Sequence, residues 1–484
     1  MRKTRRASRV KDSIGTIRLL GSILYPSGGP EEVARSIAID SLASLITSRE
    51  ARVGVVGLGY VGLPLAVELA RSGFRVTGID VSQKRVCAIR AGVSHIVDVS
   101  SDELGPLVRE GKLEATDSYE ALPDLDVVFI CVPTPHDAAK APDLAYVEAA
   151  SREIGKRLRV GQLVVLESTT YPGTTEEVML PLLQASGLIP GQDFSVAFSP
   201  ERVDPGNTKF DTRTTPKVVG GLTPRCSQLT KLMFEQILDG SATVHVVSSP
   251  RAAEMTKLLE NCFRSVNIAL VNEMALLCDR MGINIWEVIE AAATKPFGYM
   301  PFYPGPGVGG HCIPVDPYYL SWKARQYDFY TKFIELAAEI NLSMPFYVAQ
   351  KVAEALNSRD KSVRDSNVLV LGAAFKKDVN DARNAPSLRV MELLLKDGAR
   401  IEYHDPYVSE ITVGLGIYSR KSQDIRLESI VLDADTLKAA DCVLITVAHS
   451  NFDFDWIVAN ARLVVDAVNA TRAVTGNKEN VVLI

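Results

Sequence analysis

The sequence lacks a CxxC pair, a long apolar run and a strong excess of either charge. Its seven cysteines are widely spaced along 484 residues, which argues against a disulfide framework or a zinc site and indicates a reducing, cytoplasmic setting. No apolar run reaches the roughly 20 residues that span a bilayer, so no integral membrane segment is expected. The net charge of −5 gives no reason to expect a nucleic-acid partner.

A glycine-rich turn follows the first clear strand pattern, the β-branched run 53–56. Gly57–Gly62 has the order GxGxxG, in which the glycines permit a tight turn, the approach of a pyrophosphate and close helix packing. A second strand pattern, 75–79, ends at Asp80, where a carboxylate would bind ribose hydroxyls and repel a 2′-phosphate. The motif therefore predicts NAD rather than NADP, with the nearby Arg85 as the feature that favours NADP.

Three further predicted strands each end in a polar or turn-forming cluster. The strands are predicted at 126–132, 163–166 and 194–198, and the clusters are Pro133–Pro135, Glu167–Gly173 and Ser199–Arg202. Alternation of such strands with helical patterns predicts a parallel, doubly wound sheet. Ligands bind beyond the carboxyl ends of the strands in these sheets, so the clusters are expected to surround one crevice. Ordinary loops rich in proline and threonine are the alternative.

A long helical pattern runs from Pro250 to about Ala293. Lys257, Asn261 and Arg264 recur on it at spacings of four and three residues, so they share one face. That face is either a solvated stripe or the wall of a polar site, and the residues themselves leave both interpretations open.

The next segment, 304–317, is rich in proline and glycine and ends near a single candidate nucleophile. Its composition predicts an irregular loop whose backbone comes close to a ligand. Free cysteines are usually small buried hydrophobes, and we interpret six of the seven in this way. Cys312 differs because it follows two glycines and has His311 and Asp316 nearby.

A cysteine beside NAD has a specific chemical use. Hydride transfer from an alcohol gives an aldehyde, which donates a second hydride readily only after a nucleophile has added to it. A thiolate whose pKa is lowered by a nearby cation is such a nucleophile near neutral pH. The second transfer leaves a thioester that water hydrolyses. NAD together with a positioned cysteine therefore predicts a four-electron oxidation of an alcohol to an acid.

Taken together, these motifs resemble the nucleotide-sugar 6-dehydrogenases, the family of UDP-glucose and UDP-N-acetylhexosamine dehydrogenases. The resemblance extends from Arg52 to about Thr471. It rests on the glycine turn with Asp80, Ser168–Gly173, Ser199–Arg202, Lys257 with Asn261, Gly309–Cys312, Asp316, and Phe375–Asp378 leading to Arg383.

The resemblance implies a role for each matching residue. Cys312 would be the nucleophile, Lys257 and Asn261 would stabilise the reacting oxygen, Asp316 would be the base with a water held by Thr170, and Glu201 would assist thioester hydrolysis. The predicted cofactor-binding residues are Gly57, Gly59, Tyr60, Val61, Gly62, Asp80, Arg85, Thr134 and Thr170. The predicted substrate-binding residues are Glu201, Arg202, Lys257, Asn261, Arg264, Gly309, His311, Lys376 and Arg383, the last for the UDP moiety.

Two departures from the UDP-glucose enzymes bear on the substrate. His311 stands where they usually have serine, and Pro205 stands where they have a second glutamate, for which Asp204 is a substitute to consider. Both differences are typical of members that act on 2-acetamido sugars, and the stretch 293–303 looks most like UDP-N-acetylglucosamine 6-dehydrogenases. The resemblance thus implies oxidation at C6 of UDP-N-acetylglucosamine for polysaccharide or glycan biosynthesis. UDP-N-acetylmannosamine and UDP-glucose are the alternative substrates.

The C-terminal part predicts a second Rossmann-like unit without a GxGxxG turn. A helix is expected from about 319 to 357 with an interruption near Pro345, and strands are expected at 368–372, 442–446 and 463–467. The resemblance assigns this unit the UDP half of the substrate and assigns the central helices a contact in a homodimer or higher homo-oligomer.

The expected fold class is therefore α/β, with two Rossmann-like doubly wound parallel-sheet domains joined by long central helices. The expected parts are an N-terminal extension at 1–50, an NAD-binding domain at 51–249, a central helical and dimerisation region with the cysteine loop at 250–360, and a UDP-binding domain at 361–484. The basic extension is interpreted as a loosely packed leader, with attraction to a membrane surface as the alternative.

Two other functions remain open. A two-electron hydroxyacid dehydrogenase also joins a Rossmann domain to long helices, but it would need no cysteine. A non-catalytic NAD-binding scaffold would have a vestigial site, whereas every reactive position here carries a residue type that suits the chemistry.

Overall fold

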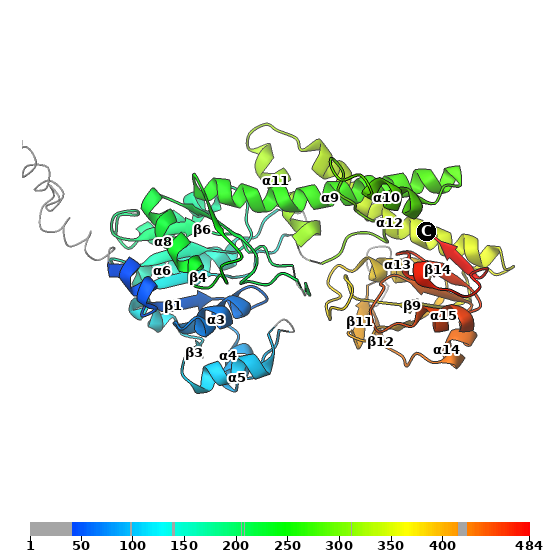
Figure 1. Cartoon of the computed structure of the whole chain (residues 1–484), viewed down its shortest axis with the longest axis horizontal. Coiled ribbons are helices and arrows are strands. Elements are labelled where there is room, and N and C mark those ends of the chain that lie inside the picture. The colour runs from blue at the N-terminus through cyan, green and yellow to red at the C-terminus, as the bar shows by residue number, and fades with distance from the viewer. Residues whose placement is uncertain are drawn as a thin grey trace, which may run out of the picture.

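The computed structural model describes residues 41–96, 99–137, 141–204, 206–207, 209–310, 312–414 and 424–484. Each of two lobes is built on a parallel or mostly parallel β-sheet, and long helices, α9 and α12, lie across and between them (Figure 1). This arrangement confirms the expected α/β fold class. No helix in the described ranges is long and apolar enough to cross a membrane.

Within the described residues the first sheet has eight strands, in the order β3-β2-β1-β4-β5-β6-β7-β8. Their bounds are β1 (Arg52–Val56), β2 (Arg75–Ile79), β3 (Leu113–Thr116), β4 (Val127–Ile130), β5 (Leu163–Leu166), β6 (Ser195–Phe198), β7 (Lys217–Gly221) and β8 (Val244–Val247). All strands from β3 to β6 are parallel, whereas β7 pairs with β6 in the antiparallel sense and β8 runs parallel to β7. The five strands predicted from apolar runs are confirmed, and β3, β7 and β8 were not predicted.

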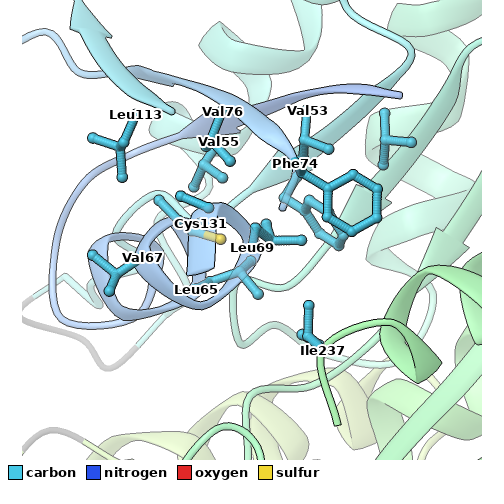
Figure 2. Close-up of a cluster of buried hydrophobic side chains, with 14 of the residues drawn as sticks. Val53, Val55, Leu65, Val67, Leu69, Phe74, Val76, Leu113, Cys131 and Ile237 are labelled. Atoms are coloured by element: carbon cyan, nitrogen blue, oxygen red, sulfur yellow. The ribbon is translucent and has the colours of Figure 1, made fainter. Parts of the chain in front are cut away.

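Helices cover both faces of this sheet. They are α3 (Gly62–Arg71), α4 (Gln83–Arg90), α5 (Ser101–Arg109), α6 (Ala145–Arg157), α7 (Leu180–Gln184) and α8 (Pro224–Glu235), with short turns η1 (Tyr119–Asp124) and η2 (Thr175–Met179). Figure 2 shows Leu65 of α3 near Val53 and Val55 of β1, which point to one face because strand side chains alternate. Val56 and Ile130 belong to a second buried cluster.

The predicted N-terminal extension, 1–50, is described only from residue 41. Leu42 and Ile46 are 2% and 0% exposed and belong to the same core as α3. The end of this segment is therefore packed onto the first lobe. The basic part of the extension lies outside the described residues.

The central helices differ from the prediction in where they break. They are α9 (Pro250–Met281), α10 (Ile285–Ala293), α11 (Cys312–Arg325) and α12 (Lys332–Asn357). The unbroken helix expected over 250–293 is wrong, because Gly282 takes a left-handed conformation with φ 68° and ends α9. The expected interruption near Pro345 is also wrong: α12 continues through it, packed along α9, and the actual break is at 326–331.

The second sheet has the order β10-β9-β13-β14-β15 among the described residues, with all neighbours parallel. Its strands are β9 (Asn367–Leu371), β10 (Arg400–His404), β13 (Cys442–Ile445), β14 (Val464–Asp466) and β15 (Val481–Leu483), and β11 (Glu410–Val413) with β12 (Ile425–Glu428) forms a separate hairpin. Around it lie α13 (Pro386–Lys396), α14 (Ala434–Ala439), α15 (Phe454–Asn460) and η3 (Ala470–Ala473). The three strands predicted here are confirmed.

Asp405 follows β10 as Asp80 follows β2, but its surroundings are different. Its Oδ2 accepts hydrogen bonds from the backbone N–H groups of Ala373 and Ala374, at 2.7 and 3.0 Å, and lies 3.0 Å from Nε2 of the buried His449. Burial favours the neutral acid, but His449 and the backbone donors hold the pKa of Asp405 at about 2. In the second lobe Asp405 therefore stabilises the turn after β9 through these hydrogen bonds.

Candidate active site

Cys312 is the first residue of α11 rather than part of an irregular loop. The expectation that 304–317 holds no regular structure is wrong from this residue onward. Pro314 is tolerated because it lies in the first turn, where backbone N–H groups have no partner within the helix. Asp316 follows one turn later and shares a face with Cys312. The helix thus brings the predicted nucleophile and the predicted base together.

Asp316 is buried and partly satisfied. Its Oδ2 accepts a hydrogen bond from Nδ2 of Asn261 at 2.6 Å, whereas its Oδ1 has no hydrogen-bond partner within the part of the chain that the structure describes. Burial raises the pKa of Asp316 to about 6, although the charge of Lys257 and the bond from Asn261 act in the opposite direction. A carboxylate that titrates near neutrality and has an unused oxygen is suited to accept a proton.

Lys257 and Asn261 lie one turn apart on α9 and are 8% and 4% exposed. The alternative of a solvated stripe is therefore wrong for these two residues. Lys257 Nζ donates a hydrogen bond to the carbonyl oxygen of Glu201 at 2.7 Å. An ammonium has three N–H groups, so others are left to face a ligand. Arg264, on the same side of the helix, is partly exposed.

The thiol of Cys312 has a raised pKa in this structure. Burial is the main cause and the charge of Asp316 adds to it, while Lys257 and Arg264 act in the opposite direction. Nearby cations thus do act to lower this pKa, as the chemistry requires, but burial and the charge of Asp316 outweigh them. The thiol needs a base to remove its proton, and Asp316 on the next turn of α11 is in place for that role.

Thr170 follows β5 and supplies a second unsatisfied atom. It is 1% exposed, and no described residue makes a hydrogen bond to its hydroxyl. Buried polar atoms of this kind are normally satisfied by an ordered water or a ligand. Thr170 and Asp316 thus each offer a buried polar atom that has no hydrogen-bond partner among the described residues.

Glu201 is held from several sides. Its Oε1 accepts the backbone N–H groups of Arg202 and Val203, both at 2.7 Å, and its Oε2 accepts a hydrogen bond from Lys217 Nζ at 2.7 Å. Burial favours the neutral acid, but Lys217 and the backbone donors lower the pKa of Glu201 overall. The neighbouring Arg202 is paired with Glu260 of α9 at 2.7 Å.

The glycine turn has the geometry that a dinucleotide requires. Gly57 has φ 92°, a conformation that L side chains rarely adopt, and a Cβ on Gly62 would collide with the carbonyl of Gly57. A Cβ on Gly59 would meet nothing within 4 Å, so this side of the turn is open for a pyrophosphate. The residues present therefore fit the cofactor. Tyr60 and Val61 complete the turn before α3.

Asp80 is 5% exposed and stabilises the glycine turn through hydrogen bonds to backbone N–H groups. Its Oδ2 accepts the N–H of Leu58 at 2.9 Å and its Oδ1 accepts the N–H of Ser82 at 2.8 Å. An ionised carboxylate has about four acceptor sites, so sites remain for ribose hydroxyls. The guanidinium of Arg85 lies 3.3 Å from Oδ2 of Asp80. This ion pair occupies the cation that could otherwise bind a 2′-phosphate.

The second lobe holds the backbone immediately before the cysteine. Gly310, with φ 82°, donates its N–H to the carbonyl of Arg383 at 3.1 Å and accepts a bond from Asn384 Nδ2 at 3.0 Å. A Cβ on Gly310 would press against the ring of Phe375, and one on Gly309 would press against Phe375 and Pro386. Two parts of the chain more than 60 residues apart therefore fix the start of α11. His311 lies outside the described residues.

Two predicted substrate residues of the second lobe reach across to the first. Lys376 Nζ is 2.6 Å from a carboxylate oxygen of Asp204, and the Arg383 guanidinium lies 4.9 Å from the ring centroid of Tyr60. Arg383 therefore stands beside the cofactor turn, where it could reach phosphate groups of either ligand. Thr134, at the end of β4, accepts a hydrogen bond from the hydroxyl of the buried Tyr319.

Lys217 and Glu254 were missed by sequence reasoning. Glu254 is 0% exposed and accepts hydrogen bonds from the N–H groups of Gly173 and Thr175 and from the Thr175 hydroxyl, at 2.5 to 2.8 Å. It ties the loop after Thr170 to α9. Its position three residues before Lys257 was a usable signal, because that spacing places it on the polar face.

Family models match three consecutive parts of the chain. Residues 51–238 match the NAD binding domain of the UDP-glucose/GDP-mannose dehydrogenase family, residues 251–343 match its central domain, and residues 369–473 match its UDP binding domain.

Individual proteins are similar over nearly the same region. A UDP-N-acetyl-D-glucosamine 6-dehydrogenase of Pseudomonas aeruginosa is 37% identical over 407 residues, which cover 84% of this chain and 92% of that protein. A UDP-N-acetyl-D-mannosamine dehydrogenase of Pyrococcus horikoshii is 37% identical over 402 residues, which cover 83% of this chain and 90% of that protein. The solved structure of a UDP-D-ManNAc dehydrogenase from Pyrococcus horikoshii matches with a TM-score of 0.79 at 33% identity, over 89% of this chain and 98% of that chain.

Proposed function

The chain belongs to the UDP-glucose/GDP-mannose dehydrogenase family and is an NAD-dependent UDP-sugar dehydrogenase, and we propose that it oxidises the C6 hydroxyl of UDP-N-acetylglucosamine to the acid. The observation that carries the proposal is the arrangement at the start of α11. Cys312 and Asp316 share one face, Asn261 holds one oxygen of Asp316, and the other oxygen has no partner among the described residues.

In the proposed mechanism Asp316 is the base and Cys312 the nucleophile. Asp316 accepts the proton of the C6 hydroxyl, passes it to solvent water, and then accepts the proton of the Cys312 thiol, directly or through a water that Thr170 holds. Lys257 and Asn261 donate hydrogen bonds to the oxygen on C6, which carries negative charge as alkoxide and as the thiohemiacetal oxygen. Bound NAD supplies a hydride acceptor, and two molecules are used in turn for each sugar.

The last step releases the acid from the cysteine. Water adds to the carbonyl carbon of the thioester, the bond from that carbon to the Cys312 sulfur breaks, and Glu201 accepts one proton of the water. The Cys312 thiolate takes up a proton, which restores the thiol for another turnover. Four electrons leave the substrate in all, as two hydrides.

The remaining predicted residues are proposed to bind the two ligands. We propose that Lys376 and Arg383 bind phosphate groups, so their present contacts with Asp204 and Tyr60 would be exchanged for ligand contacts. The other proposed substrate contacts are Arg202, Arg264, Gly309 and His311, and the proposed cofactor contacts are Gly57, Gly59, Tyr60, Val61, Gly62, Asp80, Arg85, Thr134 and Thr170. We propose that the chain is divided into an N-terminal extension and three domains at residues 50, 249 and 360. We also propose a cytoplasmic location, because NAD and nucleotide sugars are made there.

The choice of a 2-acetamido sugar rests on His311 and Pro205, and the choice of UDP-N-acetylglucosamine among such sugars rests on the stretch 293–303, which resembles the enzymes for that substrate. UDP-N-acetylmannosamine is the second candidate, because the relative from Pyrococcus horikoshii is as similar to this chain, at 37%, as the one from Pseudomonas aeruginosa. Incubation with NAD and each UDP-sugar in turn should give two NADH per sugar and the highest kcat/KM with UDP-N-acetylglucosamine. A higher value with the mannosamine epimer would correct the substrate, and one NADH per sugar would indicate a two-electron enzyme. No NADH with any UDP-sugar would favour a non-catalytic scaffold.

Replacing Asp80 with serine should weaken NAD binding and shift the preference toward NADP. Hydrogen bonds to a charged group contribute about 1.5–3 kcal/mol, so the Kd for NADH should rise about tenfold to a hundredfold. The change also removes the repulsion of a 2′-phosphate and releases Arg85 to bind it. Titration with NADH and NADPH measures both effects. The exposed Asp102, changed to serine, is the matched control. An unchanged ratio of the Kd for NADPH to the Kd for NADH in the Asp80 variant would contradict the assignment of Asp80.

We further propose that the chain forms a homodimer or a higher homo-oligomer through α9. Six exposed apolar residues recur along this helix at spacings of four and seven, which places them in one stripe. They are Met255, Leu259, Phe263, Leu270, Leu277 and Met281, with exposed fractions between 39% and 61%. At 1.5 Å per residue the stripe is about 39 Å long. A second copy offers a stripe of the same length, as a two-fold interface requires.

An aspartate in place of Leu270 should separate the subunits. The substitution puts a charge in the middle of the stripe, where a partner would have to desolvate it. Light scattering after size-exclusion chromatography should give the dimer mass for the wild type and the monomer mass for L270D. Val431, which is 77% exposed in the second lobe, provides the control V431D. A monomeric wild type, or an L270D variant that remains dimeric, would refute the interface.

A further inference from the structure

Three ionisable side chains lie together at one edge of the first sheet: Glu167 and Lys217 are buried, and the side chain of Glu201 is 13% exposed. β5 ends at Leu166, which pairs with Phe198 at the end of β6, so Glu167 and Glu201 both follow the carboxyl ends of these strands. β7 runs antiparallel to β6, and Phe198 pairs with Gly220. Its first residue, Lys217, therefore comes to the same edge as the two glutamates.

Lys217 is the cation of this cluster. It is 0% exposed, its Nζ lies 2.7 Å from Glu201 Oε2, and the ring of Phe234 packs against it with its centroid 5.3 Å from Nζ. Glu167 is 1% exposed, and its Oε2 accepts a weak hydrogen bond from the Cys131 thiol at 3.5 Å. No described residue makes a hydrogen bond to Oε1 of Glu167.

The two glutamates differ in charge because Lys217 pairs directly with only one of them. Burial raises the pKa of Glu167 to about 7, with Lys217 lowering it and Glu201 raising it. Burial also acts on Glu201, but the contact with Lys217 and the backbone donors bring the pKa of Glu201 below its ordinary value. At neutral pH Glu201 is thus ionised, whereas Glu167 is close to its pKa and exchanges a proton.

The contact of Lys217 with Glu201 also bears on Lys257. Lys257 donates to the backbone carbonyl of Glu201, and its charge already acts on the Glu201 carboxylate. An isolated carboxylate in this buried place would be costly, so without Lys217 it would take up a proton or attract Lys257. Either change would alter Glu201 as a proton acceptor.

We propose that Lys217 is a positioning residue for thioester hydrolysis, which holds the Glu201 carboxylate ionised and oriented toward the attacking water. This inference rests on the proposed function. Glu201 Oε1 already accepts two N–H groups and Oε2 accepts one, so Oε2 keeps a lone pair for the water. In the step itself the carbon–oxygen bond forms, the carbon–sulfur bond to Cys312 breaks, and the water proton passes to Glu201.

A variant that lacks the ammonium, Lys217→Met, should stall after both hydride transfers. Mixing it with UDP-N-acetylglucosamine and excess NAD should give a burst of two NADH per site, followed by a steady rate at least about a hundredfold below the wild type. Intact-mass measurement should show the acyl adduct on Cys312. Lys217→Arg, which keeps a cation, should recover much of the steady rate. Lys231, which is partly exposed on α8 and lies 3.6 Å from Glu235, changed to methionine, is the control and should behave as the wild type.

The double variant K217M/E201Q tests whether Lys217 acts through Glu201. If it does, the hydrolysis rate of K217M/E201Q equals that of E201Q, because nothing is left to position. If K217M alone does not fold, the double variant can still overturn the inference, because removing both charges leaves neither Lys217 nor Glu201 as an unpaired buried ion and a further loss relative to E201Q would show that Lys217 acts apart from Glu201. The inference is overturned by wild-type hydrolysis in K217M, by loss of the first hydride transfer without an adduct, or by a further loss in the double variant. A wild type that yields no NADH with any UDP-sugar would instead refute the proposed function.

Discussion

Replacing Cys312 with alanine should abolish acid formation, with a fall in rate of at least about a thousandfold. The reason is chemical: without a nucleophile on the aldehyde carbon, the second hydride has no ready donor, and no thioester forms. The first oxidation does not need the thiol, so C312A should still produce a trace of NADH and aldehyde. Coupled measurement of NADH and of the sugar acid by chromatography separates the two steps.

The control for this substitution is Cys87, which is the exposed free cysteine on α4. C87A should keep full activity, because exposure alone does not make a thiol catalytic. Acid formation by C312A at a substantial fraction of the wild-type rate would mean that the aldehyde is oxidised as its hydrate. In that case Cys312 would be a structural residue at the start of α11.

Local sequence was sufficient for the parts of the fold that depend on local chemistry. The strands at 53–56 and 163–166 are β-branched or apolar runs that are buried on both faces, which is what a parallel sheet requires. The turn Gly57–Gly62 was predictable because its backbone conformation leaves little choice of residue. The pairing of Lys257 with Asn261 on one face followed from helical spacing alone.

The missing parts of the site depend on contacts between distant segments. Lys217 reaches Glu201 only because β7 is antiparallel, and no local pattern fixes that direction. Gly310 is held by Asn384, from the other lobe, and nothing near either residue indicates the partner. The composition of 304–317 suggested a loop, yet α11 begins at Cys312, with Pro314 in its first turn, where proline is tolerated, and Pro317 inside the helix. The raised pKa of Cys312 likewise arises from burial, which sequence does not measure.

These non-local contacts meet at one place. The glycine turn, the start of α11 and the loop around Arg383 come from three widely separated parts of the chain, and Arg383 contacts both Tyr60 and Gly310. A ligand that moves Arg383 would therefore act on the backbone next to Cys312. This gives the two lobes a physical connection at the proposed reacting atoms.

Replacing Asp316 with asparagine should lower kcat/KM by about a hundredfold to ten-thousandfold, which is the usual contribution of a general base. The pKa of Asp316 is about 6, so in the wild type kcat/KM should rise as the pH increases through this value and the carboxylate becomes ionised. The asparagine in D316N has no proton to lose, so kcat/KM of this variant should not rise with pH in this range. A profile of kcat/KM against pH, measured for both proteins, tests the assignment. An unchanged rise in D316N would assign it to another group.

The same substitution should stabilise the folded protein at neutral pH. The pKa of Asp316 is raised from 3.8 to about 6 by burial, so between these values the folded state keeps a proton that the unfolded state has lost. The free energy of unfolding therefore falls as the pH rises through this window, by a total on the order of 3 kcal/mol, and stays lower above it. D316N avoids this loss, so its advantage in urea unfolding should grow from about pH 4 to about pH 6 and stay nearly constant above that. C312A keeps Asp316 and should follow the wild-type pH dependence. If D316N were less stable than the wild type at the higher pH, the hydrogen bond from Asn261 to the carboxylate would outweigh the burial of its charge, and Asp316 would be ionised in the folded protein well below pH 6.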